Sequence, residues 1–254
     1  MITIPGLVGG SLTMAGPSPA MTESVQMSDV IDPVAIKPGV VRARDAASLI
    51  LLRGEGRDLE LLAGRRPLTV RFMPGVYVFP GGAVDAEDNR PWQTEAEITS
   101  LPPRLLRCAR AALRETWEEA GVFFGHSGSV PAGMRSSSPV AEAYAEAGVV
   151  AAFDRLRYVG RAITPARVFR RFNTRFFFGD GSDVVGEPYA TDELEDVRWH
   201  PIGREPLEPL RDVSQFMLAQ AIALRAGKAL PPPLFYTVSG KRRIGVCREA
   251  GVAR

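Results

Sequence analysis

One segment, residues 103–120, constrains the fold of this 254-residue chain more than any other. It reads PRLLRCARAALRETWEEA, with a proline at its first position and with Gly121 directly after it. Proline is favoured in the first turn of a helix, and glycine is favoured just beyond the last turn. The sequence therefore predicts a helix over residues 103–120.

The predicted helix separates apolar side chains from charged ones. At about 100° per residue, one side carries Leu105, Ala109, Ala112, Leu113, Thr116, Trp117 and Ala120, and the other carries Arg107, Arg110, Arg114, Glu115, Glu118 and Glu119. Glu115, Glu118 and Glu119 follow the i, i+3, i+4 spacing, so their carboxylates cluster and repel one another. Two explanations stay open. The face is solvated, with Arg110 and Arg114 as ion-pair partners, or a hard divalent cation offsets the repulsion.

Further elements follow from hydrophobic patterns and turn residues. Strands are predicted over 40–52, 59–63, 76–79, 156–163, 173–178 and 197–200, and helices over 140–153 and 212–225. Mixed strands and helices without strict βαβ alternation favour an α/β class, an α/β/α sandwich with a mixed sheet. We expect a disordered tail over 1–38, one domain over 39–238 and a basic C-terminal tail over 239–254.

Charge and composition exclude several classes of protein. A net charge of +2 argues against general nucleic-acid binding, which needs many basic contacts to phosphates. No apolar run reaches the roughly 18 residues that a membrane span needs. Cys108 and Cys247 offer neither a disulfide framework nor a zinc motif, so we expect a cytoplasmic protein. The oligomeric state stays open, with a homodimer as one alternative.

The segment 114–122, RETWEEAGV, resembles the second half of the Nudix box. The first half of that box is a glycine, five residues and a glutamate, and here Gly82 is followed by five residues and then by Asp88. Between Asp88 and Arg114 lie 25 residues where the family has seven, so the box carries an 18-residue insertion. The resemblance implies the Nudix fold and a metal-dependent hydrolase that cleaves a diphosphate bond in a nucleotide-like small molecule.

One Nudix branch, the coenzyme A and acyl-coenzyme A diphosphatases, is more similar still. Its members can have aspartate at this point of the box and an enlarged loop before the helix. Its signature is matched by Arg66, Arg71, Gly75, Phe79, Pro80, Gly81 and Gly82, with Pro67 in place of a serine. The resemblance implies cleavage of coenzyme A or an acyl-coenzyme A. The alternatives are another nucleoside diphosphate derivative, such as NADH or ADP-ribose, and a Nudix-fold binding module without turnover.

The same resemblance implies the residues of the site. Glu115, Glu118 and Glu119 would hold Mg²⁺ or Mn²⁺, helped by the backbone carbonyl of Gly82, because a glycine lets the chain approach an ion closely. Arg114 would act in catalysis as an orienting group that holds a carboxylate through two hydrogen bonds.

A later loop is expected to supply the general base, and its acids are Glu187, Asp192, Glu193 and Glu195. Among these we choose Glu193 as the catalytic base; the alternative is that all four are solvent-exposed loop acids.

Arginines are the candidates for binding substrate phosphates. Arg66 and Arg71 flank the loop that leads to Gly82, and their alternative role is a surface ion pair. A second cluster comprises Arg155, Arg157, Arg161, Arg167, Arg170, Arg171 and Arg175. That cluster could bind the 3′-phosphate that distinguishes coenzyme A, or it could lie on a solvated face of the sheet.

Overall fold

A computed structural model of the chain describes residues 42–92, 101–128, 138–166, 168, 170–228, 230–247 and 249. The chain divides into two units, Met1–Val34 and Ala35–Arg254, and all described residues belong to the second. The disordered tail that the sequence predicts over 1–38 lies outside the described residues.

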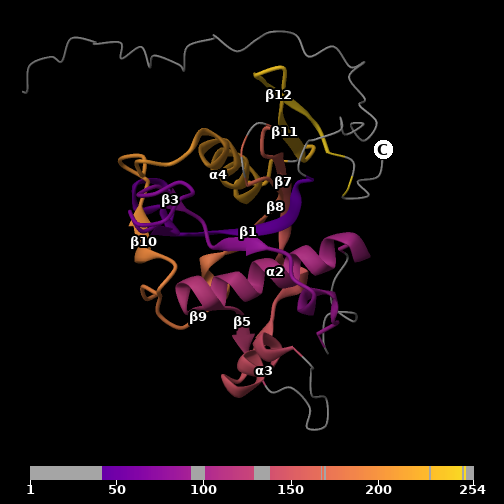
Figure 1. Cartoon of the computed structure of the whole chain (residues 1–254). Coiled ribbons are helices and arrows are strands. Elements are labelled where there is room, and N and C mark those ends of the chain that lie inside the picture. Colours follow the sequence, from indigo (N-terminus) through magenta and orange to yellow (C-terminus); the bar gives the residue numbers. More distant parts are fainter. Residues whose placement is uncertain are drawn as a thin grey trace, which may run out of the picture. The chain divides into compact units, whose positions relative to one another are not determined.

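The main sheet is mixed and, within the described residues, contains nine strands. They are β1 (Arg44–Arg53), β2 (Glu60–Arg65), β3 (Tyr77–Val78), β4 (Gly81–Ala83), β7 (Arg157–Ile163), β8 (Phe172–Asp180), β10 (Glu195–Pro201), β11 (Pro233–Val238) and β12 (Lys241–Val246). The order is β10-β2-β1-β8-β7-β11-β12, with β3 beside β2 and β4 beside β1 (Figure 1). The pairs β1–β8 and β7–β11 are parallel, and the remaining pairs are antiparallel.

Two helices, α2 (Pro103–Ala120) and α4 (Asp212–Arg225), lie on opposite faces of this sheet (Figure 1). Successive side chains of a strand point to opposite faces, and β1 shows this directly. Its Leu49 and Leu51 belong to the core on the α2 side, whereas Ile50 and Leu52 belong to the core on the α4 side. The expected α/β/α sandwich with a mixed sheet is confirmed. No helix in the described part of the chain is long and apolar enough to cross a membrane.

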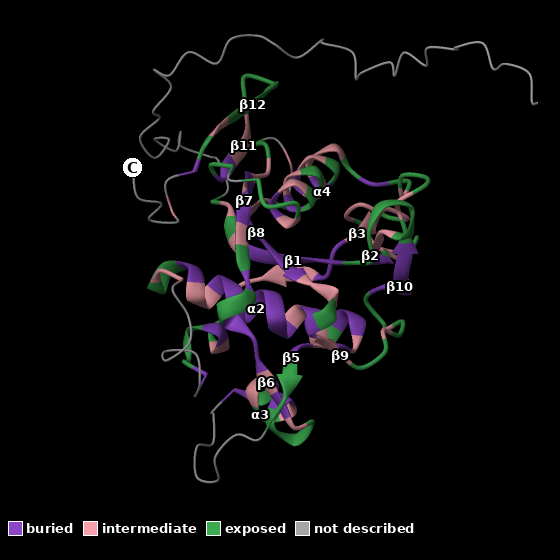
Figure 2. Cartoon of the chain, turned by 180° about the vertical axis from the view of Figure 1, so that it is seen from behind, coloured by how far each residue is buried: buried purple, intermediate pink, exposed green. Residues whose placement is uncertain are grey.

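A smaller layer covers the side of α2 that faces away from the main sheet. It contains the sheet β6-β5-β9, made of β5 (Phe123–Ser127), β6 (Val149–Ala151) and β9 (Val184–Val185), together with helix α3 (Pro139–Glu146). Short 3₁₀ turns, Gly56–Asp58, Glu87–Asn89, Phe153–Arg155 and Gly181–Asp183, connect the elements. Buried Phe124, Tyr144 and Phe153 belong to the same core as α2. Helix α2 is therefore packed from two sides, and Figure 2 shows most of it as buried or intermediate.

Most predicted elements are confirmed, and two expectations are corrected. The helices predicted over 103–120 and 212–225 are present as α2 and α4. The helix predicted over 140–153 instead ends at Glu146, because the chain turns at Gly148, which has a φ of 66°, and then enters β6. The boundary expected at residue 238 falls inside the hairpin of β11 and β12, so residues 241–246 belong to the main sheet.

Candidate active site

The second half of α2 carries the three glutamates that the sequence singles out. Gly121 ends this helix in the left-handed conformation, with a φ of 70°, and its N–H donates to the carbonyl of Trp117 at 2.9 Å. Glu119 is only 3% exposed, and on the same charged face Arg110 is 6% and Arg114 is 4% exposed. These three charges are buried, so a solvated helix face does not account for them.

Strand β4 places Gly81 and Gly82, together called the glycine corner, against these carboxylates. In the pairing with β1, Gly82 lies opposite Ala47. The backbone N–H of Gly81 donates to Oε2 of Glu119 at 2.8 Å. A Cβ atom on Gly82 would lie 2.3 Å from Oε1 of Glu115, which is too close for any real side chain. Position 82 must therefore be glycine for the Glu115 carboxylate to keep its place.

Arg114 links the glutamates to the start of the inserted loop. Its Nε and Nη2 each donate to one carboxylate oxygen of Asp88, both at 3.1 Å. Nη2 also donates to the carbonyl of Ala83 at 2.9 Å, and Nη1 donates to Oε2 of Glu118 at 2.7 Å. Oε1 of Glu115 lies 3.1 Å from Nη1. The two-point contact expected for Arg114 is present, with Asp88 as the partner.

The sequence does not reveal the contacts that Asp88 makes in the folded protein. Its side chain is 1% exposed and accepts a hydrogen bond from the N–H of Asp85 at 2.7 Å. Its carbonyl accepts one from Nη1 of Arg110 at 2.7 Å. The box pattern marked Asp88 as an acid, but its partner Arg114 lies 26 positions later, far beyond the reach of spacing rules along one helix.

The electrostatics of the cluster favour added positive charge. Burial raises the pKa of Glu119 to about 8 and that of Glu115 to about 7, and repulsion from neighbouring carboxylates adds to both shifts. Burial also raises the pKa of Glu118. Burial alone would lower the pKa of Arg114, but its hydrogen bonds to Asp88 and the nearby carboxylates raise it. One arginine thus holds its charge without neutralising all three glutamates.

The donor set suits a hard cation, although the side chains as placed bind protein groups. Among the residues that the structure describes, no three His, Cys, Asp or Glu side chains are arranged to hold one metal ion. Glu115 and Glu118 face Arg114, and Glu119 accepts from Gly81. Carboxylate oxygens are nevertheless the ligands that Mg²⁺ and Mn²⁺ prefer. Burial is the main cause of the raised pKa values, and a cation bound here would favour the charged form of these carboxylates.

The connection between β9 and β10 is fastened to the end of α2. The N–H of Tyr189 donates to the carbonyl of Ala120 at 3.2 Å, and Oγ1 of Thr191 donates to the carbonyl of Glu119 at 3.3 Å. Glu193 follows, with its N–H on Oγ1 of Thr191 at 3.3 Å. Its negative charge contributes to the raised pKa values of all three glutamates on α2. Glu193 thus follows a residue that is hydrogen-bonded to the end of α2, and its side chain is exposed.

Comparisons with known proteins identify the family. No family model matches the chain. A crystal structure of a NUDIX hydrolase from Alicyclobacillus acidocaldarius is 30% identical, with a TM-score of 0.51, and the match covers 73% of this chain and 92% of that one. This chain belongs to the Nudix hydrolase family. It is also 30% identical over 208 residues to "Putative nudix hydrolase 7" of Caenorhabditis elegans. That match covers 77% of this chain, which spans 59% of the relative's length.

The other acids of the Nudix protein's β9–β10 connection lie differently from Glu193. Glu195 pairs with Arg65 at 3.3 Å on the neighbouring strand. Glu187 and Asp192 have exposed side chains. For Glu187 and Asp192 the alternative of a solvent-exposed loop acid is therefore confirmed.

Arg66 and Arg71 both lie in the connection between β2 and β3 of the Nudix domain. Nε of Arg66 donates to the carbonyl of Phe72 at 3.0 Å, which closes the loop on itself. The charge of Arg66 also opposes the upward shift of the Glu119 pKa, so this guanidinium lies near the acidic cluster. Arg71 is exposed on the same loop. The structure thus brings Arg66 toward the site and leaves Arg71 at the loop surface.

Two members of the second arginine cluster, Arg161 and Arg175, pair with acids in the interior of the Nudix fold, whereas Arg155, Arg157 and Arg170 are exposed. Nη1 of Arg161 lies 2.7 Å from Oε1 of Glu249, and Nη2 of Arg175 lies 2.9 Å from the same oxygen. Arg175 is 8% exposed and also pairs with Asp45 at 2.6 Å. For these two arginines the expectation of a solvated sheet face is wrong, because the C-terminal segment supplies a buried counter-charge. Arg167 lies outside the described residues.

Proposed function

We propose that this Nudix protein hydrolyses the diphosphate bond of coenzyme A or an acyl-coenzyme A, with Mg²⁺ or Mn²⁺ as cofactor. The observation that carries the proposal is the gathering of three glutamates beside Gly81 and Gly82, where Glu115 and Glu118 share Arg114 and Glu119 accepts from the Gly81 N–H. The spacing from Arg66 to Gly82, which resembles the coenzyme A diphosphatases, supports this choice of substrate.

The chain's own residues would divide the work as follows. A divalent cation held by the glutamates and the Gly82 carbonyl would neutralise charge on the diphosphate oxygens. Arg114 holds the carboxylate of Glu118 in place and is itself fixed by Asp88. Arg66 and Arg71 would donate hydrogen bonds to phosphate oxygens. These groups position the reacting phosphorus and stabilise the charge that builds up on it.

Glu193 would act as the general base. A base must lie within hydrogen-bond reach of the proton that it takes, directly or through one water. Glu193 is exposed and is close enough to the acidic cluster to raise its pKa values. It would accept a proton from the attacking water, whose oxygen bonds to phosphorus while the bridging P–O bond breaks. The products are a phosphopantetheine and adenosine 3′,5′-bisphosphate.

A substrate panel tests the proposal. Purified protein with Mg²⁺ or Mn²⁺ is incubated with coenzyme A, an acyl-coenzyme A, NADH and ADP-ribose, and the products are identified by mass spectrometry. We expect the highest kcat/KM with the coenzyme A substrates and loss of turnover when EDTA is added. If NADH or ADP-ribose gives the highest kcat/KM, the proposed substrate is wrong and that compound takes its place. If a compound binds tightly and none is turned over, the protein is a binding module.

A further inference from the structure

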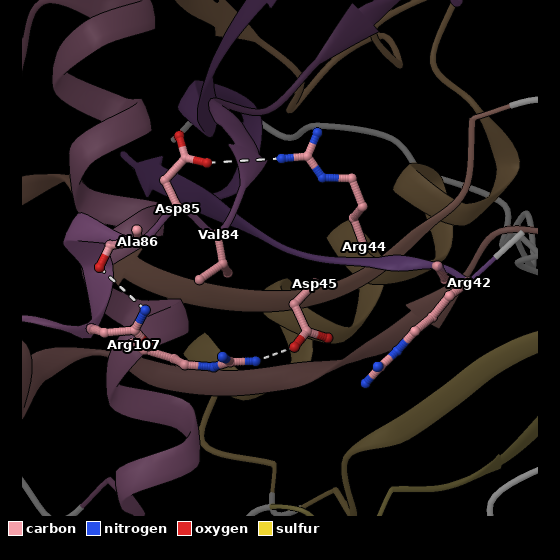
Figure 3. A pocket seen from close by; sticks show the side chains of 9 residues that line it. Arg42, Arg44, Asp45, Val84, Asp85, Ala86 and Arg107 are labelled. Carbon is pink, nitrogen blue, oxygen red and sulfur yellow. Dashed lines mark hydrogen bonds and ion pairs between the residues drawn. The ribbon is translucent and has the colours of Figure 1, made fainter.

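A pocket of about 360 Å³ lies beside the proposed active site. Its walls are the start of β1, the loop that follows β4, and Arg107 from α2 (Figure 3). Sites for small ligands usually have volumes of roughly 300 to 1,000 Å³, so this pocket can hold one chemical group of a nucleotide. The proposed mechanism gives it no part.

The pocket carries an excess of positive charge. Three guanidinium groups line it, those of Arg42, Arg44 and Arg107. The Asp45 carboxylate pairs with Arg107 through Oδ2 and lies 2.6 Å from Nη1 of Arg175 through Oδ1. Among the described residues that line the pocket, Asp85 is therefore the one acid left to balance Arg42 and Arg44. Figure 3 draws no interaction between Arg42 and the other residues that line the pocket. An anion is therefore the kind of ligand that this space favours.

The other acid in the wall competes only weakly with an anionic ligand. Asp85 lies 3.8 Å from Nη2 of Arg44, and both side chains are more than half exposed, at 57% and 66%. Exposed ion pairs of this kind contribute about 0 to 1 kcal/mol. Arg44 can therefore turn from Asp85 to a phosphate at small cost.

Two chain paths connect the pocket to Gly82, and helix α2 connects it to Arg114. Asp45 lies two residues before Ala47, the β1 partner of Gly82, and Val84 lies two residues after Gly82. Two residues of strand span about 7 Å. Arg107 lies two helical turns before Arg114 on the same face of α2, a separation of about 10 Å. A single extended nucleotide can therefore occupy both places.

The two buried-network members of the second arginine cluster, Arg161 and Arg175, do not offer the same opportunity. Arg161 and Arg175 share the carboxylate of Glu249, whose side chain is 15% exposed. The hydroxyl of Tyr158 also donates to that carboxylate, at 3.3 Å. An incoming phosphate would have to displace a buried partner there, whereas in the pocket it would displace only the exposed contact of Arg44 with Asp85.

We propose that this pocket binds a phosphate monoester, and that in the proposed reaction this is the 3′-phosphate of coenzyme A. The inference rests on the proposed function for the identity of the substrate and not for the chemistry of the pocket. Inorganic phosphate has the same chemistry, so the experiment must separate a group on the substrate from a free anion.

The test compares coenzyme A with dephospho-coenzyme A, which lacks only the 3′-phosphate. Kinetics are measured for the unaltered protein, for the double variant Arg42→Ala/Arg44→Ala, and for Arg57→Ala, a control with an exposed arginine in another loop. We expect the double variant to raise KM for coenzyme A about tenfold, since charge-assisted hydrogen bonds to phosphate are lost. KM for dephospho-coenzyme A should stay unchanged in both variants.

Calorimetry gives a readout that does not depend on turnover. Adenosine 3′,5′-bisphosphate should bind more tightly than AMP, and the double variant should remove the difference. If coenzyme A is hydrolysed but the double variant leaves both comparisons unaltered, the pocket assignment is overturned and the proposed function stands. If neither substrate is hydrolysed, the proposed function fails, and the calorimetric difference alone decides for or against the pocket. A third outcome is that inorganic phosphate competes for the pocket, that the double variant abolishes this competition, and that adenosine 3′,5′-bisphosphate binds no more tightly than AMP. That outcome would overturn the assignment of the pocket to the substrate's 3′-phosphate.

Discussion

The two faces of the main sheet bury different kinds of side chain. On the α4 face, strand β1 packs against Met217 and Ala221, and the buried residues of α4 are Ser214, Met217, Ala221 and Leu224, none of them charged. On the α2 face, the same strand packs against a helix that also buries Arg110, Arg114 and Glu119. Burying charge is costly unless it is paired. The comparison teaches that one face of this sheet serves as scaffold, while the other holds charges that only a function explains.

The largest expected effect comes from Glu118→Gln on the α2 face. Turnover should fall by about two to three orders of magnitude, because a charged oxygen beside the reacting phosphate is lost. The melting temperature should hardly change, since Glu118 is 40% exposed and Arg114 keeps its two hydrogen bonds to Asp88. Steady-state kinetics and a thermal melt measure both. The control is Glu146→Gln on α3, an exposed glutamate, and unchanged turnover in Glu118→Gln would exclude the role proposed for it.

Asp88→Asn should affect stability and activity together. Removing one charge from a buried pair costs about 3 kcal/mol or more, and here it leaves Arg114 without its two-point partner. Urea unfolding measures the first effect and kcat the second. Asp154→Asn, at an exposed acid, is the control. A loss of stability with kcat intact would mean that Arg114 does not orient the site.

Met217→Ala on the α4 face should affect stability alone. Truncating a fully buried methionine costs about 2 to 5 kcal/mol, and Met217 is 0% exposed. The kcat of the molecules that remain folded should equal that of the unaltered protein. Ile222→Ala on the same helix, at a side chain that is 37% exposed, should cost much less. A fall in kcat for Met217→Ala at temperatures where the variant is folded would show that the two faces are coupled.

The smallest expected effect is a pH dependence through His200, next to the scaffold side. Burial, and then the charge of Arg198, lower the pKa of His200 below its usual 6.5. The unfolded chain therefore binds a proton that the folded chain refuses, and stability is lost as pH falls below about 6.5. Urea unfolding at pH 5.5 and 7.5 measures this loss. The variant His200→Gln should lose less stability over the same interval, and an equal loss in both proteins would contradict the assignment.

The sequence predicted the helices and strands that have clear end signals and a regular hydrophobic pattern. Pro103 and Gly121 marked both ends of α2, and the glutamates fell on its charged face. Strands β4, β5, β6 and β9 were missed because they are short, and the hairpin of β11 and β12 was missed because it has no regular alternation. The predicted helix over 140–153 overran Glu146, because Gly148 and the branched residues after it weigh little in a helical pattern.

The sequence predicted which acidic residues gather in the site, but it did not predict that their helix face is buried. Spacing placed Glu115, Glu118 and Glu119 together, but one helix cannot reveal that β4 and the Glu87–Asn89 turn will pack against its polar face. The pairing of Arg114 with Asp88 crosses the inserted loop, and long-range partners of this kind follow from topology. The counter-charge at Glu249 was likewise hidden, since it reaches the arginines of β7 and β8 from a distant part of the chain.

That last contact makes one glutamate near the end of the chain a counter-ion for the inside of the sheet. Glu249 neutralises Arg175, which shares Asp45 with Arg107 of α2. Positive and negative groups thus alternate from the C-terminal segment through β8 and β1 to the helix that carries the glutamates. Proteolytic trimming ahead of residue 249 would remove more than a peripheral peptide. Arg175 would then be left with Asp45 as its carboxylate partner, and Asp45 also pairs with Arg107, two helical turns before Arg114.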